Sequence, residues 1–278
     1  MFRKSIYLKN RKAYNKKRKT KKPVSLILHH ISVNTLKPKK RYRRGYPVAI
    51  LIGLEENTAA LWQIFSKVAK PEKTVYLNGT RNNPKDVYNF HEAIINAVRP
   101  TLKEGVRSII LATPPRTTYN QELINHIQEH HKWLTQGPNK AVFSTITAAA
   151  STIAQVAELT RTSSFYKLIS ETTQEEAENL IQILEKRINM TDNTNLVLFS
   201  LEEAETLIVK RHNPNEPKPD YLLITDKYLT EKRQKNRLHR LIQIATNKQV
   251  KTRIIKAESP TGKRITQFGG FICLAQPN

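Results

Sequence analysis

Charge divides this chain into two unequal parts, and the division limits where a folded core can form. The first 54 residues hold 17 of the 47 Lys and Arg and none of the 23 Asp and Glu, so the remaining 224 residues hold 30 basic and 23 acidic residues. A block of like charge without acidic neighbours is more often a disordered or nucleic-acid-bound tail than a folded surface. We therefore expect a packed body that follows a basic arm.

The body is long enough for two domains of ordinary size. The chain has 278 residues, and the part beyond the arm fits two domains of about 110 residues each. Hydrophobic residues make up 38% of the chain, a slightly low value whose deficit lies in the arm. We expect the arm at residues 1–46 and the two domains at residues 47–165 and 166–278.

Cysteine usage and hydropathy favour a cytoplasmic location. Cys273 is the only cysteine, so the chain can build neither a disulfide framework nor a cysteine zinc site. No run of about 18 apolar residues occurs, and residues 1–22 lack the apolar core of a secretory signal, so we expect neither a membrane span nor export. An Arg-rich organellar presequence is the alternative, but Lys clusters recur beyond residue 36 and suit RNA better.

The arm has the residue types that bind RNA. Tyrosine rings lie among its cations, and such rings can stack on exposed bases while the cations neutralise phosphates. The alternative is a solvated tail that aids solubility, and the 17 uncompensated cations favour RNA binding over it. The candidate RNA-binding residues of the arm are Arg3, Lys4, Lys9, Arg11, Lys12, Tyr14, Lys16, Lys17, Arg18, Lys19, Lys21, Lys22, Lys37, Lys39, Lys40, Arg41, Tyr42, Arg43 and Arg44.

Apolar runs predict an α/β unit directly after the arm. Three short runs are typical of an antiparallel meander of strands, at residues 47–54, 59–68 and 73–78. Asn83 and Pro84 are a good helix start, and periodic apolar residues follow them as far as Pro100. Further strands are expected at residues 108–113 and 140–146, and further helices at residues 118–133 and 148–159. Strands that alternate with helices after a meander favour an α/β sandwich.

A second α/β unit of the βαβ type is expected to begin near residues 163–170. Helices are predicted at residues 175–188, 202–210 and 230–247, strands at residues 195–201, 220–226, 252–257 and 269–275, and a turn at residues 259–262. The helix at residues 230–247 has a basic face, made of Lys232, Arg233, Lys235, Arg237, Arg240 and Lys248. That face is either solvated or an auxiliary contact with RNA.

Three motifs occur in order in the second unit: LVLFSLEEAETLIV at residues 196–209, DYLLITDKYL at residues 220–229 and ITQFGGFICLAQP at residues 265–277. With these motifs the second unit resembles the third domain of the eukaryotic and archaeal-type peptide release factors and of their paralogue Pelota. The first unit has three predicted strands, a long helix, SIILATPP at residues 108–115, a further helix and KAVFSTITAA at residues 140–149. In this order it is similar to the RNase H-like middle domain of the same superfamily. The resemblance therefore covers residues 47–278 and implies two α/β sandwich domains. It also implies that the family's N-terminal decoding domain is replaced by the arm, so we expect no stop-codon recognition.

The resemblance also indicates where a motif for peptidyl-tRNA hydrolysis would lie. Release factors use a Gly-Gly-Gln tripeptide between the third strand and the first long helix of the middle domain. Here that connection is Asn-Gly-Thr-Arg-Asn-Asn-Pro at residues 78–84, without Gly-Gly or Gln. The resemblance thus implies no catalytic residue, as in Pelota, and Arg81 and Lys85 of this region remain candidates for RNA contact. The pair Gly269 and Gly270 is expected in the closing strand with a packing role.

No cofactor and no metal site are predicted. His126, His130 and His131 include a pair at i and i+4 that could ligate a metal, but without a third ligand they are better explained as a solvated helix end. Asp86, Glu92, Asp226 and Glu231 are carboxylates that a nuclease could use, and no clustered pair among them can be placed.

These observations favour a non-catalytic, ribosome-associated factor that binds ribosomal RNA through its arm. Ribosome rescue, protection of idle ribosomes and a stable place in the ribosome are all compatible with the sequence. The resemblance permits tRNA, a translational GTPase and a ribosome-recycling ATPase as further partners. Two alternatives are a divergent peptidyl-tRNA hydrolase or RNA-cleaving enzyme of the superfamily, and an RNA-binding protein that acts away from the ribosome.

Overall fold

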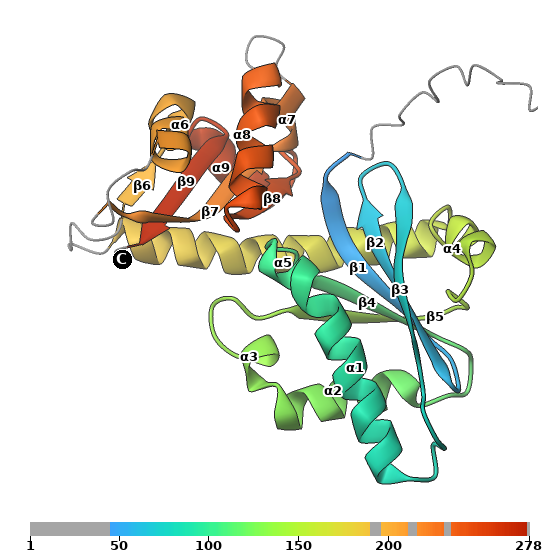
Figure 1. Ribbon diagram of the computed structural model, residues 1–278. Helices are drawn as coiled ribbons and strands as arrows, with labels where there is room; N and C mark the ends of the chain where they lie inside the picture. The colour runs from blue at the N-terminus through green and yellow to red at the C-terminus, as the bar shows by residue number, and fades with distance from the viewer. Residues whose placement is uncertain (1–44, 190–195, 211–215, 231–234, 277–278) are drawn as a thin grey trace, which may run out of the picture. The chain divides into compact units, whose positions relative to one another are not determined.

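The computed structural model describes residues 45–189, 196–210, 216–230 and 235–276. These residues contain two β-sheets covered by helices, which confirms the predicted α/β fold class (Figure 1). They lie in one compact unit, which comprises residues 43–278. In the described ranges, no helix has the length and apolar character needed to cross a membrane.

The first sheet has the strand order β3-β2-β1-β4-β5. The predicted meander is confirmed, because β1 pairs antiparallel with β2 and β2 pairs antiparallel with β3. Strand β4 then pairs parallel with β1, and β5 pairs parallel with β4. The strands are β1 Pro47–Leu54, β2 Thr58–Phe65, β3 Ala69–Tyr76, β4 Ser108–Thr113 and β5 Val142–Thr147.

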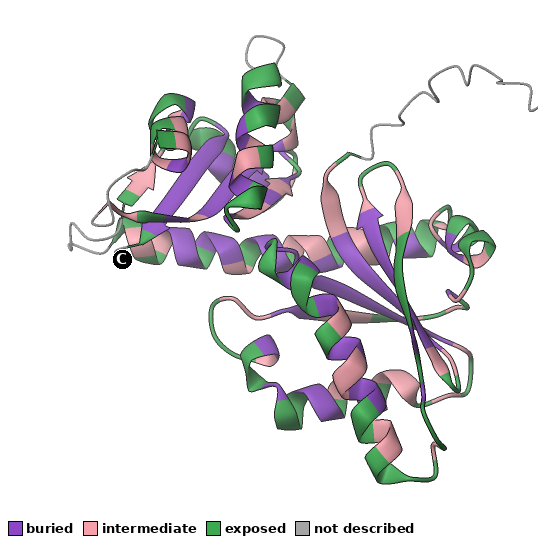
Figure 2. Ribbon diagram, in the orientation of Figure 1, coloured by how far each residue is buried: buried purple, intermediate pink, exposed green. Residues whose placement is uncertain are grey.

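Strands β1, β2 and β4 are buried on both faces, which explains their nearly continuous apolar sequences, whereas the edge strand β3 is largely exposed. In β1, Ile50 and Ile52 pack in one hydrophobic cluster and Ala49 and Leu51 pack in another, because successive side chains point to opposite faces. Figure 2 shows the buried residues along the strands and on the helix sides turned toward them. The first face packs against α1 Pro84–Lys103 and α2 Tyr119–His130, and the second against α4 Ile153–Leu159 and the start of α5 Ser163–Ile188.

The second sheet has the strand order β6-β9-β7-β8, in which only β7 and β8 are parallel. One face packs against the C-terminal half of α5 and against α9, and the other packs against α6 and α8. Its elements are β6 Leu196–Leu198, α6 Leu201–Lys210, β7 Lys218–Thr225, α7 Asp226–Thr230, α8 Lys235–Asn247, β8 Lys251–Ile255, α9 Pro260–Gln267 and β9 Phe271–Gln276.

Helix α5 belongs to both cores, which the sequence pattern does not predict. The predicted helix begins at residue 175, but α5 begins at Ser163, where the side chain of Thr162 accepts a hydrogen bond from the backbone N–H of Phe165 at 3.2 Å. Phe165 packs in the core of the first sheet, and Leu180 and Leu184 pack in the core of the second. The predicted domain boundary at residues 165/166 therefore lies inside a continuous helix.

Three other predicted elements are corrected. The helix expected at residues 148–159 begins only at Ile153, because Thr152 and Gln155 form a capping box there. The helix expected at residues 118–133 breaks at His131, and a short helix α3 Lys132–Thr135 follows it. The turn expected at residues 259–262 is the first turn of α9, since the hydroxyl of Ser259 accepts a hydrogen bond from the backbone N–H of Gly262 at 3.0 Å.

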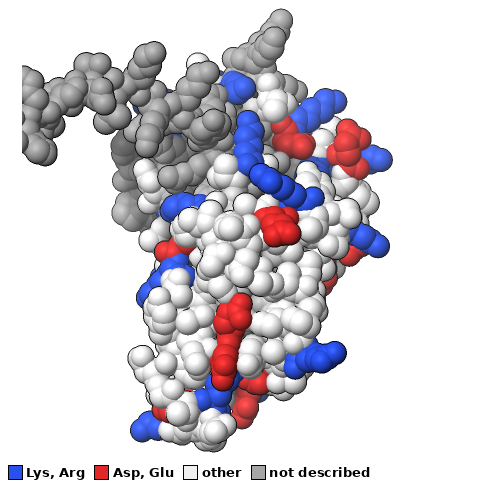
Figure 3. Space-filling model, turned by 90° about the vertical axis from the view of Figure 1, so that its right-hand side faces the viewer, with Lys and Arg blue, Asp and Glu red and all other residues white. Residues whose placement is uncertain are grey.

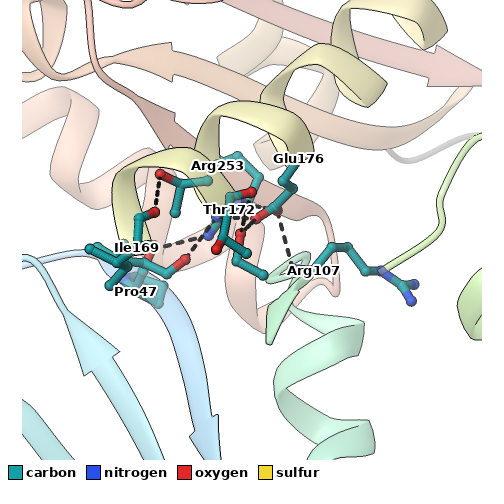
Figure 4. A network of polar contacts seen from close by, with 9 residues as sticks. Pro47, Arg107, Ile169, Thr172, Glu176 and Arg253 are labelled. Atoms are coloured by element: carbon teal, nitrogen blue, oxygen red, sulfur yellow. Dashed lines mark hydrogen bonds and ion pairs between the residues drawn. The ribbon is translucent and has the colours of Figure 1, made fainter. Parts of the chain in front are cut away.

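A buried ion pair connects the two sheets (Figure 4). Arg253 of β8 contacts Glu176 of α5 through Nε and Oε1 at 2.7 Å, and both side chains are buried. The same guanidinium donates to the backbone carbonyls of Pro47 at 3.1 Å and Val48 at 3.0 Å. Glu176 also accepts hydrogen bonds from the hydroxyl of Ser108 and, at 3.1 Å, from the backbone N–H at residue 107. The charges are thus paired and hydrogen-bonded, which offsets the cost of burying them.

Candidate functional site

The predicted RNA-binding arm lies outside the described residues. All of its candidates, from Arg3 to Arg44, fall within residues 1–44, so their roles stay predictions. The body that follows is near charge balance, since residues after the first 54 hold 30 basic and 23 acidic residues. On the face drawn in Figure 3, basic side chains lie among acidic ones and form no continuous basic patch of described residues. The excess of basic over acidic residues in the sequence is therefore concentrated in the arm.

The connection between β3 and α1 is the segment in which the sequence resemblance leads us to look for a hydrolytic tripeptide. Gly79 has φ +113°, and a Cβ at this position would lie 2.0 Å from Oδ2 of Asp86. That same oxygen accepts a hydrogen bond from the backbone N–H of Thr80 at 3.0 Å. The side chain of Asn83 caps α1 by accepting from the backbone N–H of Lys85 at 3.1 Å. The connection is thus held against the first turn of α1, and Lys85 is exposed.

Arg81 of this connection is engaged in contacts within the protein. Its Nη1 donates to Oε2 of Glu122 at 2.8 Å and its Nη2 donates to the carbonyl of Glu55 at 3.0 Å. Its Nε donates to the carbonyl of Glu56, and the guanidinium carbon lies 3.9 Å from the ring centroid of Tyr119. These contacts give Arg81 a role in joining the β1–β2 turn to α2. RNA contact by Arg81 and Lys85 stays a prediction.

In the glycine pair of the chain, Gly270 packs closely against its surroundings, whereas a Cβ on Gly269 would meet no atom within 4 Å. Gly269 and Gly270 are predicted in the closing strand, but they lie in the turn between α9 and β9, directly before that strand. Their φ angles are +95° and +82°. The carbonyl of Gly270 accepts a hydrogen bond from the backbone N–H of Thr225 at 2.9 Å. A Cβ on Gly270 would lie 3.0 Å from the hydroxyl oxygen of Thr225. Glycine is needed here because the turn has positive φ and lies close to β7.

Part of the basic face of α8 is already paired within the protein. The Nε of Arg237 donates to Oε2 of Glu205 at 2.6 Å, and Nζ of Lys248 donates to the carbonyl of Ile208 at 2.6 Å. Arg240 is exposed. Two further predicted cations of this face, Lys232 and Arg233, lie outside the described residues. An RNA contact by α8 therefore depends on fewer cations than the sequence pattern indicates.

Histidines gather between α1 and α2, where the sequence pattern predicts a solvated helix end. His126 and His131 are buried, and both Nε2 atoms approach the same carboxylate oxygen, Oε1 of Glu92, at 3.1 and 2.5 Å. The sequence pattern pairs His126 with His130 instead. The rings of these two histidines are in contact, with centroids 4.8 Å apart, but His130 is not one of the two histidines that approach Oε1 of Glu92. The prediction of a solvated end is therefore wrong for His126 and His131.

Burial and hydrogen bonding shift the pKa values of this cluster. Burial lowers the pKa of His126, although its hydrogen bond with Glu92 opposes that shift. Burial raises the pKa of the Glu92 carboxyl, but the hydrogen bonds from His131 and His126 outweigh it, so the net shift is downward. Burial, with smaller contributions from His126 and Arg81, lowers the pKa of His91 to about 4. Glu92 is thus a carboxylate at neutral pH, and His91 is a neutral imidazole.

Comparison with known proteins finds similar solved structures and nothing else. No family model matches the chain, and no curated protein matches it. Dom34 from S. cerevisiae, described as a translation termination-like factor that interacts with Hbs1, is 16% identical with a TM-score of 0.45 over 83% of this chain and 63% of its own. Archaeal Pelota, from a model of ribosome-bound Pelota and ABCE1, is 14% identical with a TM-score of 0.46 over 88% and 64%.

The archaeal termination factor aRF1 is 12% identical with a TM-score of 0.28, over 82% of this chain and 61% of its own. The chain thus spans less than two thirds of the length of these three proteins. With identities of at most 16% and TM-scores of at most 0.46, these three likenesses carry no argument about what this chain does.

Proposed function

We propose that this chain is a ribosome-associated factor of translation whose basic arm binds ribosomal RNA. The observation that carries the proposal is the segregation of charge: 17 cations without one acidic residue precede a body whose motifs resemble a ribosome-binding superfamily. Such an arm gains affinity by releasing the counterions of the RNA backbone. In the sequence it directly precedes the unit that resembles the middle domain of that superfamily. A cytoplasmic location follows from this proposal, since the ribosome is there.

We also propose that the chain does not hydrolyse peptidyl-tRNA. The connection between β3 and α1 offers Asn78 to Asn83 in place of a Gly-Gly-Gln tripeptide, and the side chain of Arg81 is engaged in holding this connection to its surroundings. Without the tripeptide, this connection lacks the backbone with which release factors position the hydrolytic water. The sequence resemblance further supports a translational GTPase or a recycling ATPase as a partner of the C-terminal unit, with tRNA as a further ligand of the bound state.

Co-sedimentation of the full chain with purified ribosomes and separated subunits tests the ribosome proposal. We expect binding at 50 mM salt and a loss of roughly 10³-fold or more in affinity at 200 mM salt, because several phosphate contacts are made by the arm. The absence of co-sedimentation at low salt contradicts the proposal. Crosslinking that recovers chiefly non-ribosomal RNA would favour an RNA-binding role away from the ribosome.

A peptide-release assay on stalled ribosome complexes tests the lack of hydrolysis. The chain is expected to release no more nascent peptide than buffer does, while a release factor serves as the positive control. Peptide release that disappears when Asn78 to Asn83 are replaced by alanine and glycine would establish the divergent hydrolase instead.

A further inference from the structure

The cluster between α1 and α2 brings three metal-ligating atoms to one point. Glu92, His126 and His131 each offer one ligand atom, and these atoms all lie within 4.8 Å of one another. Both imidazoles are buried, with side-chain exposures of 7% and 8%, and the Glu92 side chain is 26% exposed. The three atoms therefore line a site that is enclosed on the histidine side and open to water beside Glu92.

The local backbone explains why these three atoms converge. On a regular helix His126 and His131 would point about 140° apart, because each residue turns the helix by roughly 100°. Helix α2 ends at His130, and His131 has φ −127° and ψ 52°, outside the helical region. This break turns the His131 side chain back toward His126. Glu92 comes from α1, which packs on the same face of the sheet as α2 (Figure 1).

The donor set is one that zinc and related ions take. Zn²⁺ binds imidazole nitrogen and carboxylate oxygen at about 2.0–2.2 Å, so ligand atoms around a tetrahedral ion lie roughly 3.3 Å apart. In this structure the Glu92 oxygen lies 3.1 Å from the His126 nitrogen and 2.5 Å from the His131 nitrogen. The carboxylate must move away from His131 by about 1 Å to admit an ion, and its partly exposed side chain can make that movement.

The hydrogen bond from Trp133 indicates the tautomer of His131 in the absence of an ion. Its Nε1–H donates to Nδ1 of His131 at 3.4 Å. A tryptophan N–H can only donate, so Nδ1 carries no proton and Nε2 carries the proton that is donated to Glu92. Binding an ion through Nε2 requires the other neutral tautomer, in which the single ring proton has moved from Nε2 to Nδ1, and Nδ1 can then no longer accept from Trp133. Ion binding therefore breaks this contact.

We propose that Glu92, His126 and His131 form a binding site for one divalent transition-metal ion of the zinc class. Water completes the coordination on the open side, and the ion ties α1 to α2. Neutral imidazoles and a carboxylate suit Zn²⁺, Co²⁺ and Ni²⁺, whereas Mg²⁺ and Ca²⁺ prefer sites made of oxygen ligands only. The site is independent of the RNA-binding role proposed for the arm.

Titration of the full chain with Zn²⁺ tests the proposal directly. The protein is purified without a histidine tag, stripped with a chelator and titrated by calorimetry, and Co²⁺ is used in parallel for its visible absorption bands. One equivalent of either ion is expected to bind, and Mg²⁺ is expected to give no heat. Failure to bind one equivalent of Zn²⁺ or Co²⁺ overturns the proposal.

Matched variants locate the ion. Glu92→Gln and His131→Gln each remove one ligand, and we expect either to weaken Zn²⁺ binding by at least about 100-fold, more than the 10–100-fold usual for residues that only orient a ligand. His130→Gln is the control, because His130 neighbours the cluster without sharing the Glu92 contact, and it should bind as the unchanged chain does. Wild-type affinity in both ligand variants overturns the proposal; if His131→Gln does not fold by circular dichroism, the isosteric Glu92→Gln decides it.

Tryptophan fluorescence gives a readout that a surface-bound ion would not move. Zn²⁺ should change the emission of Trp133, and Trp133→Phe should retain one equivalent of Zn²⁺ but lose the change. Trp62 is expected to be silent, because it is buried and its Nε1 donates to the carbonyl of Ala150 at 2.8 Å. Emission that stays constant while one equivalent of Zn²⁺ binds contradicts binding through Nε2 of His131.

Discussion

At the scale of single residues, Arg253 and Glu176 are expected to matter for stability, because they are buried charges with several partners each. The Arg253 guanidinium connects β8 to α5 and to two carbonyls of β1. Arg264 makes an ion pair of similar length, 2.7 Å to Glu185, but its side chain is 56% exposed. Both arginines form ion pairs of the same length but differ in burial. Comparing their variants therefore separates the effect of burial on stability from the effect of forming an ion pair.

We expect Arg253→Met to lower the free energy of unfolding by about 3–5 kcal/mol, because it leaves the Glu176 carboxylate buried without its cation. Arg264→Met should cost less than about 1 kcal/mol, since water replaces an exposed pair. Urea unfolding followed by circular dichroism measures both. Equal losses for the two variants would mean that burial of the Arg253–Glu176 pair does not matter.

Cys273 is a residue-scale probe of unfolding. It is fully buried, and burial raises the pKa of its thiol to about 12. Since the thiolate is the reactive form, we expect no alkylation by iodoacetamide at pH 8 in the native chain and complete alkylation in 8 M urea. Mass spectrometry of the two samples measures the modification. Rapid alkylation of the native chain would show that β9 opens readily.

At the scale of elements, strands are easier to predict than short helices. The run at Ser108–Thr113 is buried along its whole length and therefore reads as apolar without interruption. Helix α9 places only Ile265 among the residues of a hydrophobic core, so its sequence reads as a turn, and its start depends on Ser259 and Pro260. The histidine site escapes prediction for a related reason, since only the break at His131 brings it to His126.

Helix α5 gives the prediction at this scale. Glu175→Pro removes a hydrogen bond and introduces a clash in the middle of a helix that packs on both sheets, so we expect a loss of about 3 kcal/mol or more. Glu175→Ala is the control, because Glu175 is exposed and alanine favours helix. Thermal unfolding should show a lower midpoint for the proline variant alone. An unchanged midpoint would imply that α5 is not continuous near residue 175.

At the scale of the whole molecule, the charge of the chain is divided between an arm and a body of different composition. The sequence alone indicates the two α/β units and the division of charge, because both are readable as local patterns. It does not indicate that one helix is shared by two cores, since the contacts of Phe165 and Leu184 are made with strands far away along the chain.

Two variants with equal loss of charge test where ribosome affinity resides. Replacing Lys16, Lys17, Arg18 and Lys19 with Gln should reduce the slope of log affinity against log salt by roughly 3–4, because up to four phosphate contacts are lost. Replacing Lys67, Lys73, Lys103 and Lys132, which are exposed on the body, removes the same charge and should leave the slope within about 1 of the original. Equal slopes for the two variants would contradict RNA binding by the arm.

The shared helix also determines how this protein can be cut into pieces. Thr172 bonds to Ser144 of the first sheet at 2.7 Å, while Leu180 and Leu184 complete the core of the second. A fragment that stops at residue 165 lacks the part of α5 that packs on β4 and β5. A fragment that starts at residue 178 lacks Glu176, which pairs with Arg253, and Ala177, which packs in the core of the second sheet. We expect that neither half folds alone unless it carries most of α5. Among its described residues the chain has one such helix, and both halves use it. A protein that evolved with only one of the two sheets would therefore need its own copy of this helix.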